Sequence, residues 1–344
     1  MIYIINIAEN FSTHRAQRNV NVARALSDAG MPCKLISGNF DHGGKCYISS
    51  EDPRQILIPL LPYKSHFSVF RLVNHVWFSI AVFFICMFSR RLQGILVSSI
   101  PSELIFATSV VKRFRSKVRC VVDVRDIWPH SLPLGRVNSL LGRLFIPYSS
   151  LLNKLSFSAY DEVMIANPDF SDFVQSFGVF GKLVPLGYDS SRFPHMSAAE
   201  DGYVYVGNLN ESFDLRVFKE FLATKERITV IGDGPLREAY VESYKNACFT
   251  GLLDPNDVAL LLAKHRFGLL PITGSATLPN KLFDYYACGL AVLTNSRECA
   301  DFWSNGMYSE VEPGIYIVES DCIRKDLMID YDDVSRVIVD ALVG

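Results

Sequence analysis

The segment Thr277 to Thr294, TLPNKLFDYYACGLAVLT, constrains the fold of this chain more than any other stretch. It predicts a short helix that Pro279 opens and Gly289 closes, because proline suits a first helical turn and glycine readily adopts the left-handed backbone after the last turn. Thr277 is placed to cap the free amides at the start of this helix. The apolar run that follows, Leu290 to Leu293, predicts a buried strand. A helix that leads directly into a buried strand is typical of an α/β fold.

Lys281 and Asp284 lie on one face of the predicted helix, within its first two turns. They are three residues apart, so their side chains are neighbours beside the positive end of the helix dipole. Helix starts bind phosphate groups through free amides and the dipole, so a phosphate is expected here. An exposed ion pair on an ordinary surface helix would use the same two residues, and the segment alone does not separate the two interpretations.

The pattern P-x-K-x-F-[DE]-Y-x-A-x-G-x-x-V in this segment resembles the donor-binding segment of glycosyltransferase family 4. The resemblance implies an α/β fold of the GT-B type, in which two Rossmann-like, doubly wound parallel-sheet domains face each other across a cleft. It also implies that Lys281 contacts the diphosphate of a nucleotide sugar and that Asp284 hydrogen-bonds the ribose hydroxyls. Many members carry an additional glutamate at the position of Ala276. Some shorter bacterial members that build surface polysaccharides or lipid-linked oligosaccharides also lack it, and the chain resembles that subgroup.

The second half of the chain repeats strands followed by glycines, as a doubly wound sheet requires. Glycine at the end of a strand lets the backbone approach a ligand closely. With Lys281 and Asp284, the resemblance implies a donor site that contains Gly207, Asn208, Gly232, Gly234, Thr277 and Asn280. Many members have a diphosphate-binding arginine at the position of Asn208. Without that arginine, Lys281 must neutralise more of the negative charge of the diphosphate.

The first half predicts another Rossmann-like domain. Ile2 to Ile7 and the run CKLIS from Cys33 predict strands on either side of a helix from about Arg15 to Ala29. A further strand ends in VVDVRDIWPHSL, which places Asp126 and His130 at the sheet edge where ligands of open α/β sheets bind.

The resemblance implies that Asp126 faces the reacting sugar and is catalytic together with Lys281. An alternative role for Asp126 is a pair with Arg125 or the cap of a turn. The residues implied for acceptor binding are His14, Arg15, Arg125 and His130.

The run KLVPLGYDSSRF, from Lys182 to Phe193, resembles the point at which the family's chain crosses between its domains. We therefore expect an acceptor domain over residues 1–188 and a nucleotide-sugar domain over residues 189–325. A C-terminal helix over residues 326–344 is expected to return to the first domain.

No cofactor or catalytic metal is expected. The one D-x-D motif spans Asp330 to Asp332 and precedes an amphipathic stretch, where acidic residues favour the helix dipole. The eight cysteines form no C-x-x-C pair and no zinc-type cluster with histidine, which favours a reducing cytoplasm. The first ten residues, MIYIINIAEN, predict a core strand and not a leader.

Basic residues concentrate in the first half. Up to Leu186 there are 20 Lys and Arg against 12 Asp and Glu, a net charge of +8, whereas the remainder has 14 against 24, a net of −10. The basic residues are not interleaved with a stacking platform or a recognition motif, so nucleic acid is not the expected partner.

An anionic membrane surface is the favoured partner. Val76 to Phe88 is apolar on all sides over 13 residues, which is too short to span a bilayer and suits a buried or an interfacial helix. Arg71, Arg90 and Arg91 flank it, and the cluster KRFRSKVR begins at Lys112. A core helix with a solvated basic surface is one interpretation. Peripheral attachment to the inner face of the plasma membrane is the other, because apolar surface and adjacent cations reinforce each other there.

The resemblance covers nearly the whole chain and implies a retaining glycosyltransferase. Such an enzyme would move a hexosyl or N-acetylhexosaminyl group from a nucleotide-diphosphate sugar to a lipid-linked or polysaccharide acceptor of a cell-surface glycan. A UDP-sugar is the favoured donor. A nucleotide-sugar epimerase of similar fold is an alternative that the segment PNKLFDY disfavours. Ala276 and Asn208 keep open a non-catalytic subunit that binds a nucleotide sugar.

Overall fold

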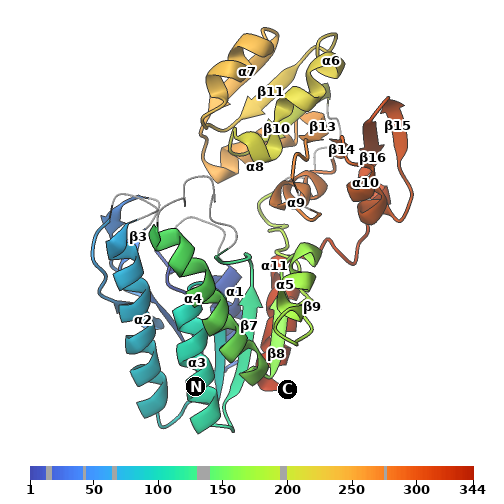
Figure 1. The fold of residues 1–344 in the computed structure, drawn as a ribbon. Helices are drawn as coiled ribbons and strands as arrows, with labels where there is room; N and C mark the ends of the chain where they lie inside the picture. Colours follow the sequence, from blue (N-terminus) through green and yellow to red (C-terminus); the bar gives the residue numbers. More distant parts are fainter. Residues whose placement is uncertain (13–17, 42–43, 64–67, 130–139, 194–199, 275–276) are drawn as a thin grey trace. The chain divides into compact units, whose positions relative to one another are not determined.

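The computed structural model describes residues 1–12, 18–41, 44–63, 68–129, 140–193, 200–274 and 277–344. The chain forms two compact units, of which unit 1 comprises Met1–Val184 with Asp332–Gly344 and unit 2 comprises Pro185–Tyr331 (Figure 1). Within these described residues, each unit is built on a seven-stranded sheet. The sequence had placed the corresponding boundaries at residues 188 and 325.

The sheet of unit 1 is entirely parallel, with strand order β5-β2-β1-β6-β7-β8-β9. Its strands are β1 (Ile2–Ile5), β2 (Cys33–Gly38), β5 (Gln55–Ile58), β6 (Gly94–Ser98), β7 (Arg119–Val124), β8 (Glu162–Ile165) and β9 (Lys182–Leu183). Two short strands, β3 (Phe40–Asp41) and β4 (Cys46–Tyr47), pair separately as an antiparallel hairpin. The strand order reverses between β1 and β6, so ligands are expected at the carboxyl ends of these strands.

The central strands of unit 1 are buried on both faces. Val97 and Val122 pack into one hydrophobic core with Phe78, whereas their neighbours Leu96 and Val121 point to the opposite face and are equally buried. Successive side chains of a strand alternate between faces, so helices must cover both sides of this sheet. The continuous apolar runs in the sequence follow from this double burial.

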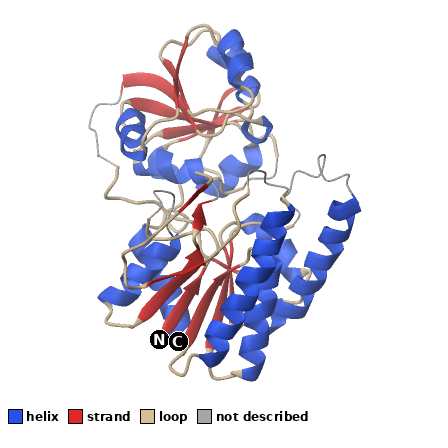
Figure 2. Cartoon of the chain, turned by 90° about the vertical axis from the view of Figure 1, so that its left-hand side faces the viewer, coloured by secondary structure: helices blue, strands red, loops and turns tan. Residues whose placement is uncertain are grey.

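The described residues of unit 1 form the helices α1 (Arg18–Asp28), α2 (Val69–Phe88), α3 (Ser102–Phe114), α4 (Leu140–Ser156), α5 (Ser171–Gln175) and α11 (Tyr331–Val343). Helices α2, α3 and α4 lie side by side on one side of the sheet (Figures 1 and 2). The last helix of the chain returns to this unit, where Arg119 Nε donates a 2.8 Å hydrogen bond to the carbonyl of Ala341. The two chain termini therefore lie near each other (Figure 2).

Helix α2 is longer than the sequence indicated. It has 20 residues, and by length and composition alone it could cross a membrane, which corrects the expectation that the apolar segment is too short. Its packing argues otherwise, because Phe78, Val82 and Cys86 are built into the protein core. The opposite face exposes Trp77, Phe84 and other large apolar side chains.

A buried ionic network stands at the carboxyl edge of the unit 1 sheet. Arg18 Nε lies 3.0 Å from Asp123 Oδ2, and both side chains are almost completely buried. Arg125 pairs with Glu9 and also approaches Asp123 Oδ2 at 3.5 Å. Glu9 accepts a 2.9 Å hydrogen bond from the backbone N–H of Asn19, so the network ties the loop after β1 to α1 and to the end of β7.

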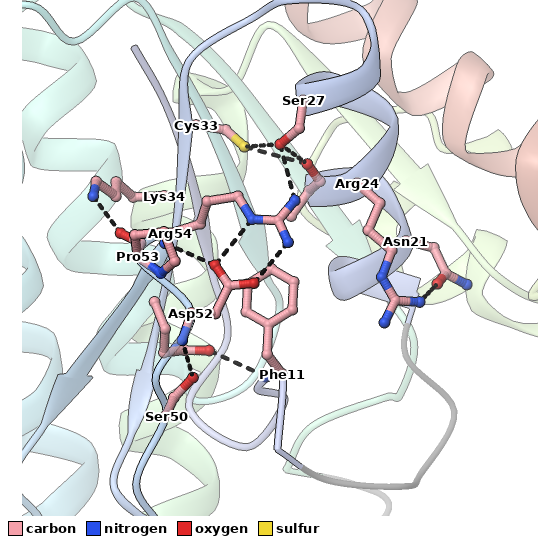
Figure 3. A network of polar contacts seen from close by, with 12 residues as sticks. Phe11, Asn21, Arg24, Ser27, Cys33, Lys34, Ser50, Asp52, Pro53 and Arg54 are labelled. Carbon is pink, nitrogen blue, oxygen red and sulfur yellow. Dashed lines mark hydrogen bonds and ion pairs between the residues drawn. The ribbon is translucent and has the colours of Figure 1, made fainter.

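A second polar network fastens the same loop to the edge of the sheet (Figure 3). Gln55 Oε1 accepts a 3.2 Å hydrogen bond from the backbone N–H of Phe11, and the guanidinium of Arg54 lies 4.6 Å from the Phe11 ring centroid. Arg54 also pairs with Asp52 at 2.6 Å and donates to Ser27 Oγ at 3.1 Å. The loop after β1 is therefore held by side chains from α1 and from the entry to β5.

The sheet of unit 2 has the order β12-β11-β10-β13-β14-β16-β15. Its strands are β10 (Glu200–Val206), β11 (Ile228–Ile231), β12 (Ala247–Gly251), β13 (His265–Leu270), β14 (Ala291–Thr294), β15 (Ser309–Glu312) and β16 (Ile315–Val318). Strands β12, β11, β10, β13 and β14 are parallel to one another. Strand β16 is antiparallel to β14, and β15 is antiparallel to β16. The helices are α6 (Lys219–Leu222), α7 (Arg237–Ser243), α8 (Pro255–Leu262), α9 (Asn280–Ala287) and α10 (Arg297–Ser304).

Replacement of Asp123 by alanine is expected to destabilise unit 1 strongly. The change would leave Arg18 and Arg125 without their shared carboxylate, and breaking a buried pair in this way costs about 3–5 kcal/mol of unfolding free energy. Urea unfolding followed by circular dichroism measures the loss. Asp333→Ala is the control, because its pair with Arg336 is exposed and should contribute at most about 1 kcal/mol. Equal effects of the two substitutions would contradict a structural role for the buried network.

Candidate functional site

The strand order of unit 2 reverses between β10 and β13. The loop after β10 carries Gly207 and Asn208, the loop after β11 carries Gly232 and Gly234, and the chain that leaves β13 enters α9. Open α/β sheets bind ligands at such a reversal. We call this region the switch-point site.

Two glycines allow the loops of the switch-point site to touch through their backbones. Gly207 and Gly232 have φ values of 141° and 128°, which side chains rarely tolerate. A Cβ atom on Gly232 would lie 2.0 Å from the carbonyl oxygen of Gly207. The Gly207 N–H donates to Ile231 O at 3.0 Å, and the next backbone bond runs from Leu209 N–H to Asp233 O at 3.0 Å. The glycines that the sequence singled out therefore let the two loops pack against each other.

The same loops line a cavity of about 740 Å³. Asn208 and the turn Gly232 to Pro235 form part of its wall, and Leu252, Leu253 and Val258 form an aliphatic part. This volume falls within the range of small-molecule sites. The lining combines backbone polar groups with apolar side chains, which suits a flat ring system that carries hydrogen-bonding groups.

Helix α9 begins one residue later than predicted. Pro279 is its N-cap and no side chain caps the helix start, so the prediction that Thr277 caps it is wrong. The Thr277 carbonyl instead accepts a 2.7 Å hydrogen bond from the indole of Trp303. The prediction for the other end is confirmed, because Gly289 has φ 73° and Leu290 N–H donates to Tyr285 O at 2.9 Å. Leu282 N–H donates to Pro279 O at 3.0 Å, whereas no side chain within the described residues caps the amides of Asn280 and Lys281.

Lys281 extends from α9 across the backbone of Gly207. A Cβ atom on Gly207 would lie 2.4 Å from Lys281 Cε, so only glycine leaves room for this path. The Nζ atom lies 3.4 Å from the ring centroid of Phe213 and 5.1 Å from that of Tyr205. No carboxylate of the described residues lies within 4.0 Å of it. Burial lowers the pKa of Lys281 to about 7, and the negative charge of Asp284 opposes that shift.

Asp284 is half-buried on the same helix. Burial raises its pKa to about 6, while the positive charges of Arg192 and Lys281 act in the opposite direction. The two residues therefore do not form the exposed ion pair that the sequence left open. The site instead holds an ammonium group against aromatic rings and a carboxylate that is mostly ionised at neutral pH. Together they can bind an anion and accept hydrogen bonds from hydroxyl groups.

Tyr205, Phe213 and Tyr285 support this arrangement and were not identified from the sequence. The buried hydroxyl of Tyr285 accepts from Val206 N–H at 3.2 Å and donates to Leu269 O at 3.0 Å, which ties β10 to β13. Tyr285 belongs to the motif that carried the resemblance, so the sequence did contain a signal for it. Phe213 lies outside any motif.

The residues expected to bind an acceptor belong to unit 1. Asp126 is half-buried just after β7, at the carboxyl edge of the sheet. Arg125 pairs with Glu9 and Asp123, which the sequence had not anticipated. His14, Arg15 and His130 lie outside the described residues, as does Ala276 of unit 2.

Within the described residues, no group of three or more His, Cys, Asp or Glu side chains is arranged to hold a metal ion. Of the D-x-D motif, Asp330 accepts a 3.0 Å hydrogen bond from the backbone N–H of Ser190, and Asp332 lies in the first turn of α11. Both positions suit the structural role expected for the motif.

Residues 201–325 match the family model described as glycosyl transferases group 1. None of the curated proteins matches the chain in sequence. Similar solved structures include HepE of Anabaena in complex with UDP, at 11% identity and a TM-score of 0.58 over 85% of this chain and 79% of that one. WaaG, described as a glycosyltransferase involved in lipopolysaccharide biosynthesis, has 15% identity and a TM-score of 0.53 over 100% and 91% of the two chains. The N-terminal domain of trehalose-6-phosphate phosphatase from Candida albicans has 11% identity and a TM-score of 0.61 over 100% and 89%.

Identities this low show the fold alone. The chain has the GT-B fold, with two α/β domains built on parallel sheets, as the sequence predicted. The family match falls entirely within the unit that contains the switch-point site.

Lys281 is expected to titrate near pH 7 in the ligand-free protein. Reductive methylation with ¹³C-formaldehyde followed by NMR titration measures this, and Lys281→Arg identifies the resonance. Phe213→Ala should move the pKa of Lys281 towards its ordinary value, because water would reach the ammonium group. Phe302→Ala is the control, since the Phe302 ring contacts Arg324 and not Lys281. A Lys281 resonance that titrates together with the exposed lysines would contradict the buried geometry.

Proposed function

We propose that the chain is a retaining glycosyltransferase that transfers a sugar from a UDP-sugar to a lipid-linked or polysaccharide acceptor in cell-surface glycan synthesis. The observation that carries this proposal is the position of Lys281, whose side chain crosses Gly207 beside the start of α9. No carboxylate of the described residues lies within 4.0 Å of its ammonium group. The match of residues 201–325 to group 1 glycosyl transferases supports it, as does the UDP complex of HepE.

In the proposed complex, Lys281 and the first-turn amides of α9, including that of Asn280, bind the diphosphate. Asp284 accepts hydrogen bonds from the ribose hydroxyls. The cavity beside Gly207 takes the base between the backbone of the Gly232 to Pro235 turn and the aliphatic wall. Asn208, Gly234 and Thr277 complete the donor site.

Lys281 would also assist the transfer itself. Its pKa of about 7 reflects a desolvated ammonium group, and a bound diphosphate would raise that value by adding negative charge. The protonated side chain then stabilises the charge that grows on the leaving diphosphate. In a same-face reaction the leaving phosphate oxygen can take the acceptor proton, so no strong base is needed. We propose that no metal cofactor takes part.

Asp126 is proposed to stabilise the developing positive charge on the sugar or to orient the acceptor. His14, Arg15 and His130 remain proposed acceptor contacts. For Arg125 the two carboxylate partners favour a supporting role, in which it fixes the carboxyl edge of the sheet near Asp126.

The proposal is tested by incubating the protein with a panel of nucleotide sugars and a membrane extract, with and without excess chelator. Release of nucleotide that depends on the extract and survives chelation is the expected result. A nucleotide sugar with inverted stereochemistry would indicate an epimerase. Binding without turnover across the panel would indicate a non-catalytic subunit.

Substitutions in the switch-point site should weaken UDP binding without unfolding the protein. Asp284→Asn removes a charge-assisted hydrogen bond of about 1.5–3 kcal/mol, which corresponds to roughly 10- to 150-fold in Kd. Lys281→Ala should weaken binding by at least about tenfold for the same reason and abolish transfer. Calorimetry measures both, with Lys264→Ala as the control because Lys264 is an exposed lysine of the same unit. Near-normal turnover of a folded Lys281→Ala protein would refute the assignment.

We further propose peripheral attachment to the cytoplasmic face of an anionic membrane. Phe88 and Phe114 are 77% and 75% exposed at the ends of α2 and α3, and Arg90, Arg91 and Lys117 are exposed nearby in the sequence. The sequence had grouped Lys112 with these cations. Its ammonium group instead lies 2.7 Å from Asp161, which removes it from the proposed membrane surface.

The triple substitution of Arg90, Arg91 and Lys117 by glutamine should weaken binding to anionic vesicles by about 100-fold, since each cation near an anionic leaflet contributes about 1 kcal/mol. Sedimentation with vesicles of known composition measures the partition, which high salt should reduce only in part. The control replaces three exposed lysines of unit 2, Lys219, Lys245 and Lys264. Equal partition to neutral and anionic vesicles, or none to either, would contradict this attachment.

A further inference from the structure

Side chains of α2, α3 and α4 line an apolar groove in unit 1. Figure 1 shows these three helices side by side. Its volume is about 470 Å³, within the range of small-molecule sites. Side chains from all three helices line it, among them Ile80, Phe84, Phe106, Val110, Tyr148 and Leu152. Ile80, Phe84 and Tyr148 are about half exposed, so the groove is part of a contiguous apolar surface that the fold leaves uncovered.

One carboxyl group interrupts this apolar lining. Glu103 lies in the first turn of α3, and its side chain is only 8% exposed. The Tyr148 hydroxyl hydrogen-bonds to this carboxyl, but Oε2 of Glu103 has no hydrogen-bond partner within the described part of the chain. Burial raises the pKa of Glu103, and the hydrogen bond from Tyr148 acts in the opposite direction. A buried polar atom without a partner is costly, and a ligand that reached it would remove that cost.

Basic residues gather at one end of the three helices that form the groove. Helices α2 and α4 contain no aspartate or glutamate. Arg90 and Arg91 follow the last turn of α2, Lys117 follows α3, and Lys154 lies in the last turn of α4. Glu103 lies at the opposite end of α3 from Lys117. The groove therefore leads from the buried carboxyl group of Glu103, near the carboxyl edge of the sheet, towards a positively charged end.

The size of the groove selects between possible occupants. An α-helix about 10 Å across fills about 400 Å³ in each turn, which is close to the volume of the whole groove. A hydrocarbon chain is much thinner than a helix, and the apolar side chains that line the groove complement it. The surrounding cations complement an anionic lipid surface.

We infer that this groove binds the hydrocarbon chain of a lipid acceptor, with an uncharged hydroxyl or amide group of the lipid at Glu103 and Tyr148 and the remainder of the chain directed towards the basic end. The inference rests on the proposed transfer to a lipid-linked acceptor and assigns the lipid a binding place within unit 1. Glu103 and Tyr148 are positioning residues in this scheme, because they hold the lipid and do not touch the reacting atoms.

The test measures binding of a fluorescent long-chain alcohol, 11-(dansylamino)undecan-1-ol, without any nucleotide sugar. Ala107→Trp places a large side chain in the groove, and Ile80→Glu places a charge on its half-exposed wall. Each substitution should weaken probe binding by at least tenfold, about the effect of losing two buried methylene groups. Ala223→Trp is the control, because Ala223 is exposed in unit 2. Undiminished probe binding by both groove variants would overturn the inference.

A second comparison tests the polar end of the groove. The alcohol probe should bind about fivefold more tightly than its methyl ether to the wild-type protein and to Glu103→Gln, whereas Glu103→Leu should lose this preference. The same preference in all three proteins would overturn the role of Glu103.

Two further measurements separate the remaining outcomes. UDP binding should be unchanged in every groove variant. A wild-type protein that binds the alcohol but not UDP would count against the proposed function and leave the groove assignment standing. Analytical ultracentrifugation should show the same mass for wild type and Ala107→Trp. A dimer that Ala107→Trp dissociates would show that a second copy occupies the groove, and would overturn the lipid assignment.

Discussion

The path of Lys281 across Gly207 is the interaction on which the switch-point site depends. It requires a glycine in the loop after β10, because any side chain there would meet the lysine. It also requires Phe213 and Tyr205 to surround the ammonium group, which removes it from water and brings its pKa to about 7. A cation in this state is poorly solvated before a ligand binds, so an anion that enters the site gains a strong partner. The contact between the loops after β10 and β11 holds Gly207 in place beneath the Lys281 side chain.

The sequence predicted the elements of this site better than their contacts. The helix that contains Lys281, its closure at Gly289 and the buried strand that follows all depend on local patterns, and the structure confirms them. The cap at Thr277 was wrong because Pro279 takes the capping position without a side-chain bond. Lys281 and Asp284 could also be read as an exposed ion pair, since nothing near them in sequence shows that Phe213 approaches from about 70 residues away. Partners brought together through space leave no periodic signal.

The same distinction holds elsewhere in the chain. Helix α2 starts seven residues before the predicted apolar run because polar side chains interrupt the pattern there. Asn74 is one of them, and it is buried because it exchanges two 2.8 Å hydrogen bonds with the backbone of Leu61. Strand β15 has four exposed residues, SEVE, and so lacks the apolar pattern by which strands are recognised. The parallel core strands, buried on both faces, were the easiest elements to predict.

The most direct test of the central claim is the proton balance of UDP binding at pH 8, measured by calorimetry in buffers with different enthalpies of ionisation. At this pH a lysine with a pKa of about 7 is mostly neutral, Asp284 with a pKa of about 6 is ionised, and the phosphates of UDP are fully charged. A diphosphate that binds Lys281 should therefore draw about one proton from the buffer. The account predicts this uptake for the wild-type protein and its loss in Lys281→Ala. Binding of UDP without proton uptake, or the same uptake in both proteins, would show that Lys281 is not the group that receives the diphosphate.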